Sequence, residues 1–171
     1  MKNIKTLVVS LSLVFVTTLA VSAQNIVFTS LTGDKIDVEA QKDKVVIMAI
    51  GASWLPLSND QAETINKLAK RYEGQDVIFY FIATDSTSSK SKNFASDDDI
   101  SKFAKRNRLN VTILRDVDGK SSIEKYNLDQ LPAFIILDKN GNPDGDPISG
   151  IDPLDEIDTA EILSKRIDKL L

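Results

Sequence analysis

The hydrophobic residues of this chain form two kinds of pattern, and these patterns alternate along the sequence. Short continuous apolar runs, rich in β-branched and aromatic residues, are typical of strands buried on both faces of a sheet. Such runs occupy residues 45–50, 77–83, 111–114 and 133–137. Between them, apolar residues three or four positions apart predict amphipathic helices. Strands that alternate with helices indicate an α/β protein whose sheet contains parallel strands.

Both ends of this pattern carry further strand signals. Residues 25–29 and 36–38 are strand candidates on either side of a Thr-Gly-Asp turn. Residues 133–137 and 147–151 flank an Asn-Gly turn, which predicts a β-hairpin. The predicted fold is therefore an α/β sandwich, in which helices flank a mixed central sheet with an N-terminal strand extension.

We expect the chain to close with a helix that starts at Asp152-Pro153, because proline is favoured in the first helical turn. Apolar residues then recur at helical spacing. They are Ile157, Ala160, Leu163, Ile167 and Leu170. A shorter helical turn is predicted at residues 121–126.

Three polar segments separate the predicted elements. Residues 84–96 are rich in Ser, Lys and Asp and are expected to form a long exposed loop. Ser96 and the three aspartates after it predict a helix start, and the role of segment 84–99 stays open between a binding loop and a solvated connection. We interpret the oxygen-rich segments 116–119 and 138–144 as turns, since neither fits the spacing of an EF-hand calcium loop.

Residues 1–23 have the three-part pattern of a secretory signal peptide. Two lysines precede an uncharged, mostly apolar run at residues 6–21, and small residues follow up to Ala23. This run is shorter than the roughly 20 residues that a membrane-spanning helix needs, which disfavours the alternative of a transmembrane anchor. We expect cleavage after Ala23, one domain over residues 24–171, a periplasmic or secreted location, and no stable membrane anchor after cleavage.

The composition removes several kinds of chemistry. The 171 residues are 42% hydrophobic and 27% charged, as in an ordinary globular domain, but they include no cysteine and no histidine. Disulfides, thiol catalysis, Cys/His zinc sites, His-ligated haem and Ser-His-Asp catalysis are therefore excluded. We expect neither a metal nor a cofactor.

The charge balance disfavours nucleic acid as a partner. Cleavage after Ala23 would remove two of the 21 basic residues and none of the 25 acidic ones, which leaves a formal charge of −6. Binding to phosphates needs clustered Lys and Arg side chains, which an acidic domain does not favour.

The order of elements, with Trp54-Leu55-Pro56-Leu57-Ser58 before a helix and Gln130-Leu131-Pro132 before a hairpin strand, resembles the thioredoxin-like superfamily. It is most similar to the exported TlpA-like thiol–disulfide oxidoreductases, a branch that neighbours the alkyl hydroperoxide reductase/thiol-specific antioxidant (redoxin) group. The resemblance covers residues 26–170. It implies a thioredoxin-like sandwich with a cis peptide bond before Pro132.

The resemblance also implies that the redox site has been lost. Leu55 and Ser58 occupy the positions of the two redox cysteines, so neither disulfide exchange nor peroxide reduction has its thiolate. Ala49 stands where many relatives keep a buried acid, and Gly51 where many keep a second aromatic residue. We therefore assign no catalytic residue and interpret the chain as redox-inactive.

Ser58 has a structural interpretation of its own. The segment Ser58-Asn59-Asp60-Gln61 has the spacing of a capping box, in which Ser and Gln side chains satisfy backbone groups at a helix start. A catalytic serine would need an activating base. A Ser–Lys dyad stays open at this stage, although nothing in the sequence places a lysine beside Ser58.

The relatives suggest a function that needs no sulfur. In them, the backbone before the cis proline pairs with an extended substrate peptide, which is a β-augmentation contact. We therefore predict a peptide-binding or chaperone-like module whose partner is an extended peptide or an exported protein. The predicted groove consists of Trp54, Leu55, Pro56, Ser58, Leu131 and Pro132.

Two alternatives remain open. One is the thiol–disulfide oxidoreductase or peroxidase activity that the family label implies, although the missing cysteines disfavour it. The other is a structural subunit of an envelope assembly. The sequence leaves the oligomeric state undetermined.

Overall fold

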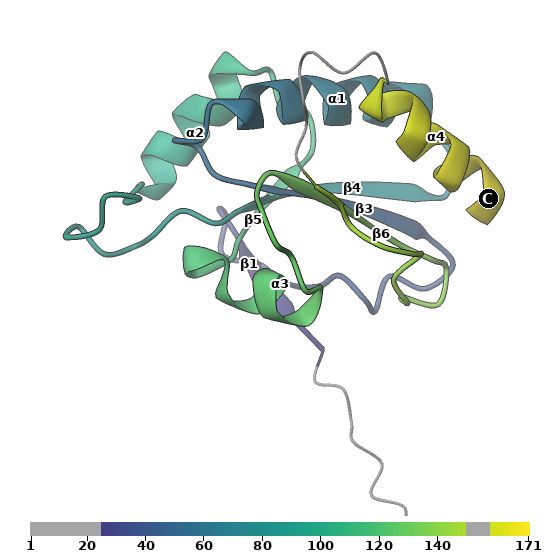
Figure 1. Ribbon diagram of the computed structural model, residues 1–171, viewed down its shortest axis with the longest axis horizontal. Helices are drawn as coiled ribbons and strands as arrows, with labels where there is room; N and C mark the ends of the chain where they lie inside the picture. Colours follow the sequence, from purple (N-terminus) through teal and green to yellow (C-terminus); the bar gives the residue numbers. More distant parts are fainter. Residues whose placement is uncertain (1–24, 150–157) are drawn as a thin grey trace, which may run out of the picture.

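All strands of the described chain belong to one mixed sheet. The computed structural model describes residues 25–149 and 158–171 (Figure 1). The strands are β1 (Val27–Ser30), β2 (Lys35–Asp37), β3 (Val45–Gly51), β4 (Val77–Ala83), β5 (Thr112–Arg115), β6 (Ala133–Leu137) and β7 (Ile148–Ser149). The helices are α1 (Leu57–Arg71), α2 (Asp97–Arg106), α3 (Lys120–Lys125) and α4 (Thr159–Leu170), with a 3-10 turn η1 (Val117–Gly119) before α3.

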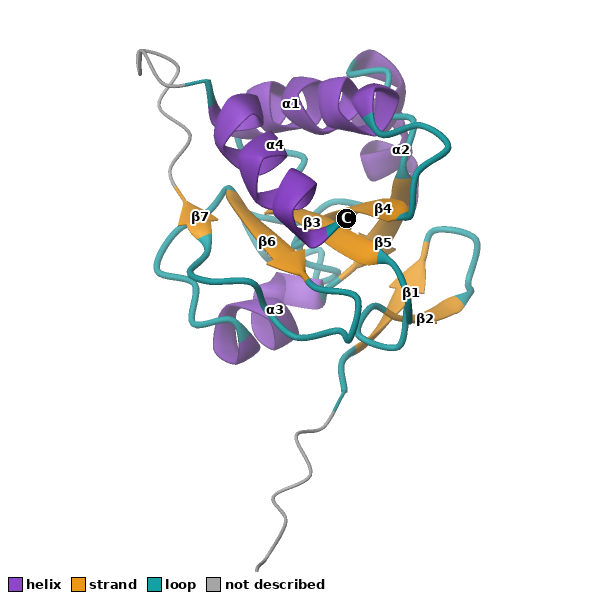
Figure 2. Cartoon of the chain, turned by 90° about the vertical axis from the view of Figure 1, so that its right-hand side faces the viewer, coloured by secondary structure: helices purple, strands orange, loops and turns teal. Residues whose placement is uncertain are grey.

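The sheet has the order β2-β1-β5-β4-β3-β6-β7. Its centre is parallel, since β3 pairs with β4 and β4 pairs with β5 in that sense. The other neighbouring strands are antiparallel. Helices α1, α2 and α4 cover one face and α3 covers the other, so the molecule has three layers (Figures 1 and 2). This arrangement confirms the predicted α/β sandwich with a mixed sheet and N-terminal strands.

Strand β3 explains why the central strands read as continuous apolar runs. All seven of its residues are buried, because helices cover both faces of the sheet. Alternate residues enter two separate cores. Val45, Ile47 and Ala49 pack under α1 and α4, whereas Val46, Met48 and Ile50 pack on the side of α3 with Tyr126. This two-sided burial places β3 and its carboxyl end rigidly in the molecule.

The predicted start of α2 is confirmed. Ser96 is the N-cap: its side chain accepts a hydrogen bond from the Asp99 backbone, and the Asp99 carboxylate accepts one from the Ser96 backbone. The three aspartates of the first turn complement the positive end of the helix.

The chain ends differ from the expectations in their detail. The hairpin is present, with Gly141 at φ +85° in its turn, but the described part of its second strand is only Ile148–Ser149. Asp158 has an extended backbone and caps α4, so this helix begins at Thr159 and does not run on from Asp152-Pro153. Asp152, Pro153 and the predicted signal peptide lie outside the described residues.

Within residues 25–149 and 158–171, no helix combines the length and apolar character required to cross a bilayer. The same residues contain no group of three acidic side chains placed to hold a metal ion. Both oxygen-rich segments form turns. Asp138 accepts hydrogen bonds from the backbones of Asn140 and Asn142, and Asp116 accepts them from Ser121 and Ser122 at the start of α3.

Candidate functional site

The two segments that carry the family resemblance meet where strands β3 and β6 end, on one side of the molecule. Residues 52–56 follow the carboxyl end of β3, and Leu131-Pro132 precede the amino end of β6. Because β3 and β6 are antiparallel and Ile50 pairs with Ala133, these two ends are neighbours. The Leu131–Pro132 peptide bond is cis, in agreement with the resemblance.

The surface at this end of the sheet is apolar. Trp54 is 49% exposed and Pro56 is exposed, while Leu55 and Leu131 are half-buried. Pro132 is buried. Four of the six predicted groove residues are therefore at least partly exposed on the two segments that meet here, and their union in one groove stays a prediction.

Ser58 is the exception, because its side chain is fully buried. Its hydroxyl accepts a hydrogen bond from the backbone N–H of Ala52 at 3.1 Å. Among the described residues it has no lysine partner, so a Ser–Lys dyad has no geometric basis there. The prediction that Ser58 lines the groove is wrong. The buried Ser58 side chain instead links the segment before Trp54 to helix α1.

The predicted capping box is also wrong. Helix α1 starts at Leu57 with Pro56 as its N-cap, and no side chain caps it. The Gln61 amide points into the protein, where Nε2 donates to the carbonyl oxygens of Ile50 at 3.2 Å and Ala133 at 2.8 Å. Ser58 and Gln61 lie three residues apart on one helix face, and that face packs on the sheet. Their hydrogen bonds therefore join α1 to β3 and β6.

Gly51 provides the space for this buried pair. A Cβ atom at Gly51 would lie 2.4 Å from Gln61 Oε1 and 2.6 Å from Ser58 Oγ. A side chain at that position would require the Gln61 and Ser58 side chains to move. Gly51 is thus coupled to the two polar side chains of α1 that pack against it.

Asp85 anchors the other side of the segment. It is fully buried, and its carboxylate accepts hydrogen bonds from the Ser53 backbone and from Ser53 Oγ at 2.6 Å. Thr84 donates to the Gly51 carbonyl through both its backbone N–H and its hydroxyl. The expectation of a long exposed loop at 84–96 is therefore wrong for Thr84, Asp85 and Ser86, and also for Ala95, because all four are buried.

Neither position of the two redox cysteines presents a nucleophile at the surface. Leu55 offers only carbon atoms, and the Ser58 hydroxyl is inaccessible. What the site does present is a half-exposed indole on a segment whose preceding residues, Ala52 and Ser53, are hydrogen-bonded to Ser58 and Asp85. Such a fixed apolar surface is suited to binding.

Comparison with known proteins places this chain in a family. Residues 19–142 match the model of the AhpC/TSA family. The chain belongs to the AhpC/TSA family. Among curated proteins it is similar to the thiol-disulfide oxidoreductase ResA of Bacillus cereus, with 27% identity over 119 residues. That match covers 70% of this chain and 63% of ResA, so the chain spans less than two thirds of the length of these relatives.

Solved structures support the thioredoxin-like fold of this AhpC/TSA member. A secreted disulfide oxidoreductase from Mycobacterium tuberculosis superposes with a TM-score of 0.64 at 24% identity, over 85% of this chain and 96% of that one. A thioredoxin-like protein from Aeropyrum pernix gives 0.67 at 18% identity, over 85% and 89%. At this level of identity the likeness establishes the fold. The cysteine-free sequence sets this member apart from the dithiol chemistry that the names of the oxidoreductases describe.

Proposed function

We propose that this protein is an exported, redox-inactive AhpC/TSA-family member that binds extended peptides or exported proteins in a chaperone-like manner. The binding surface consists of Trp54, Leu55, Pro56 and Leu131, and the buried Pro132 follows Leu131. The observation that carries this proposal is an exposed Trp54 on one of two segments that meet at this end of the sheet, together with backbone groups on the other segment that no described residue hydrogen-bonds.

Leu131 supplies those groups. Among the described residues, its backbone N–H and C=O take part in no hydrogen bond. Backbone groups near the surface that lack an internal partner can pair with an added strand. A bound peptide would place its main chain along Leu131 and its side chains on Trp54 and Leu55.

Dithiol oxidoreductase activity is the competing function, because the similar proteins carry that name. It requires a thiolate that attacks a sulfur atom, and Leu55 and Ser58 supply none. The purified protein should therefore show no disulfide reductase or peroxidase turnover. Activity that persists after removal of contaminating thiols would contradict the proposal.

Intrinsic fluorescence tests the proposed binding directly, because Trp54 is the single tryptophan of the chain. Titration with extended apolar peptides should shift Trp54 emission toward shorter wavelength and saturate. A peptide methylated at the backbone nitrogen that pairs with Leu131 should bind at least about tenfold more weakly, since one hydrogen bond is lost. If methylation of each peptide nitrogen in turn left the affinity unchanged, the peptide backbone would not pair with Leu131.

Matched variants distinguish specific binding at the groove from nonspecific binding to other apolar surface residues. Leu131→Asp should abolish the fluorescence response, whereas Ile162→Asp, at an exposed apolar position on α4, should leave it intact. A photocrosslinker at Leu55, with a control at Lys169, should form adducts with exported proteins only at Leu55. Equal labelling at both positions would show that the groove is not a binding site.

A further inference from the structure

A polar groove lies between helix α1 and the segment that connects α2 to β5. It consists of two adjoining cavities of about 770 and 390 Å³, and both are lined by Asn66 and Arg108. Among the residues that line them, Ala69 is the single apolar one. Sites for small molecules are usually lined mostly by apolar side chains, so this α1–α2 groove is suited to a charged, hydrophilic ligand.

Asparagine side chains fix the two walls of the groove relative to each other. Asn66 on α1 donates from Nδ2 to the Asn107 carbonyl at 3.0 Å, and its Oδ1 accepts from the Asn110 backbone N–H at 3.2 Å. Asn107 Nδ2 donates to Asn59 Oδ1 at 3.0 Å. The segment after α2 is therefore held against α1, and a ligand would not have to order it first.

Arg108 has a backbone conformation that arginine rarely adopts. Its φ is +52°, in the left-handed region. It follows the C-cap Asn107 of α2, where the Leu109 N–H closes the helix end by donating to the Ala104 carbonyl at 2.9 Å. This position is usually glycine. The other non-glycine residues of the described chain with positive φ are of types that tolerate it, namely Asp43, Asp118 and Asn127. An arginine kept in a strained backbone points to a function of its side chain.

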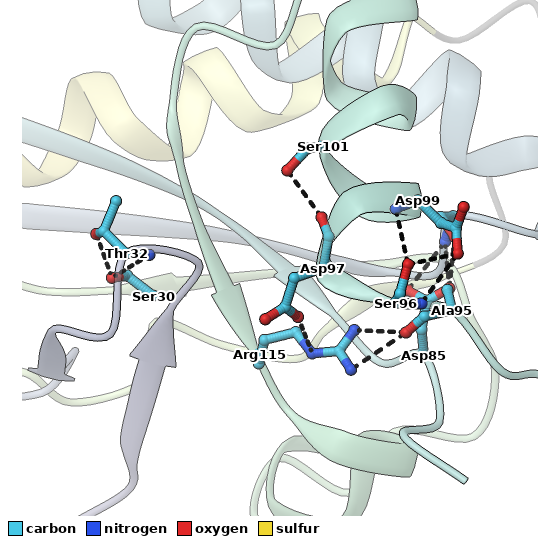
Figure 3. A network of polar contacts seen from close by, with 10 residues as sticks. Ser30, Thr32, Asp85, Ala95, Ser96, Asp97, Asp99, Ser101 and Arg115 are labelled. Carbon is cyan, nitrogen blue, oxygen red and sulfur yellow. Dashed lines mark hydrogen bonds and ion pairs between the residues drawn. The ribbon is translucent and has the colours of Figure 1, made fainter. Parts of the chain in front are cut away.

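The side chain of Arg108 differs from those of most arginines of the chain. Three of the five arginines form ion pairs, which are Arg71 with Asp168, Arg115 with Asp97, and Arg166 with Asp144. Figure 3 shows Arg115, whose two terminal nitrogens also donate to the Ala95 carbonyl at 3.4 Å. In the part of the chain that the structure describes, Arg106 and Arg108 form no ion pair. Both of them line the smaller cavity.

Arg106 has a structural explanation that Arg108 lacks. The Arg106 guanidinium carbon lies 5.7 Å from the centre of the Phe103 ring. Arg106 also stands in the last turn of α2, where a cation complements the negative end of the helix. Arg108 lies beyond that turn, and within the described residues its exposed guanidinium makes no hydrogen bond. The fold therefore does not account for the charge of Arg108.

Acidic side chains line the opposite wall. Asp60 and Glu63 on α1, and Glu73 just after it, are exposed at the groove. Within residues 25–149 and 158–171 none of the three forms an ion pair, and neither does Lys70, which lines the larger cavity. A ligand with one sign of charge would be repelled by part of this lining, whereas a ligand that carries both signs complements it.

We propose that the α1–α2 groove binds a short peptide in its zwitterionic form. The peptide carboxylate lies against Arg106 and Arg108, because a guanidinium matches the planar, two-oxygen geometry of a carboxylate. The peptide ammonium group lies against Glu63 on the opposite wall. The Asn110 side-chain amide, which makes no hydrogen bond within the described residues, is available to the peptide amides. This site goes beyond the proposed binding at Trp54 and does not depend on it.

Titration of the ¹⁵N-labelled protein with trialanine, followed by NMR, tests this assignment. The backbone amide signals of Arg108 and Asn110 should shift and saturate with a dissociation constant of about 1 mM or below. N-acetyl-trialanine lacks the ammonium group and trialanine amide lacks the carboxylate, so each should bind at least about tenfold more weakly. No saturable shift with trialanine, or equal binding of either blocked peptide, would overturn the proposal.

Substitutions separate the charge of Arg108 from its backbone. Arg108→Gly should weaken trialanine binding at least about tenfold, while the thermal midpoint should stay equal or rise, because glycine adopts positive φ without strain. Asn127→Gly, at φ +49°, is the matched control that relieves the backbone in the same way and should leave binding unchanged. Glu63→Gln should weaken the binding of trialanine but not of N-acetyl-trialanine, which has no ammonium group.

Unchanged affinity in Arg108→Gly would overturn the proposal, as would an equal loss of affinity in Asn127→Gly. The Trp54 fluorescence response to extended apolar peptides should persist in Arg108→Gly. The two binding proposals are thus followed by separate signals, and the failure of one is distinguishable from the failure of the other.

Discussion

At Gly51, the missing side chain determines how the first turn of α1 packs. The space beside its Cα is filled by the Gln61 amide and the Ser58 hydroxyl, which hydrogen-bond to groups of the adjoining sheet and segment. In a dithiol enzyme, the position of Ser58 would carry a sulfur. Here an oxygen accepts a backbone hydrogen bond instead, so the residue has a structural task.

Gly51→Ala should therefore destabilise the protein by about 1–3 kcal/mol, the usual cost of overpacking a buried site. Urea denaturation measures this change in the free energy of unfolding. In a Gln61→Ala background the same substitution should cost less, because its closest contact at 2.4 Å has been removed. Equal costs in both backgrounds would show that Gln61 is not the obstacle.

The positions of Leu55 and Ser58 are suited to a pair of cysteines. They flank the start of α1, where the helix dipole stabilises a thiolate. The double variant Leu55→Cys/Ser58→Cys should form a disulfide and catalyse the reduction of insulin by dithiothreitol. The two single-cysteine variants serve as controls and should not do so. A double variant that stays reduced in air would argue against a retained dithiol geometry.

At the scale of elements, helix α3 is joined to the connection between β2 and β3 by one polar cluster. The Glu39 carboxylate contacts Lys125 Nζ at 2.5 Å and accepts a hydrogen bond from the Tyr126 hydroxyl at 3.1 Å. Burial, and then the nearby Glu39 charge, raise the pKa of Tyr126 above its ordinary range, so its hydroxyl stays a neutral donor. Little of either charged side chain is exposed.

Lys125→Met should lower the free energy of unfolding by about 3 kcal/mol, because it leaves the Glu39 charge without its partner in a mostly buried site. Lys165→Met is the matched control: Lys165 pairs with Glu161 on the exposed face of α4. That change should cost less than about 1 kcal/mol. Equal effects in urea denaturation would contradict the structural role of the cluster.

Some elements of the fold could be predicted from the sequence, whereas several contacts between them could not. The order of strands and helices was predictable because two-sided burial produces continuous apolar runs, as in β3. The spacing of Ser58 and Gln61 suits both a capping box and an inward-facing pair, and only the position of the sheet decides between them. Asp85 has a polar neighbourhood in the sequence, and its partner Ser53 lies 32 residues away, so no local pattern indicates its burial.

At the scale of the whole molecule, several aspartates make stability depend on pH. The pKa of each of four carboxyl groups is lowered, chiefly by a hydrogen bond from a neighbouring side chain. The carboxyl group and donor pairs are Asp34 with Thr32, Asp76 with Lys44, Asp99 with Ser96, and Asp158 with Lys67. A carboxyl group whose pKa is lower in the folded state stabilises the fold above its unfolded value and loses that contribution as the pH falls.

The thermal midpoint should therefore fall as the pH drops below the ordinary aspartate value of 3.8. Calorimetry between about pH 2.5 and 7 measures this dependence. A variant with Asn at all four positions should be less stable than the wild type at neutral pH and should lose less on acidification. Parallel curves for both proteins would show that other groups control the acid transition.

The β2 edge of the sheet has a consequence for behaviour at high concentration. An edge strand exposes unpaired backbone groups on which a neighbouring chain can add, and fibrils grow in this way. Strand β2 is only three residues long and carries Lys35 and Asp37 on either side of Ile36. An incoming strand would find few groups to pair with there and two charges to accommodate. Crowded solutions of this protein should therefore resist gelation and amyloid formation from the β2 side.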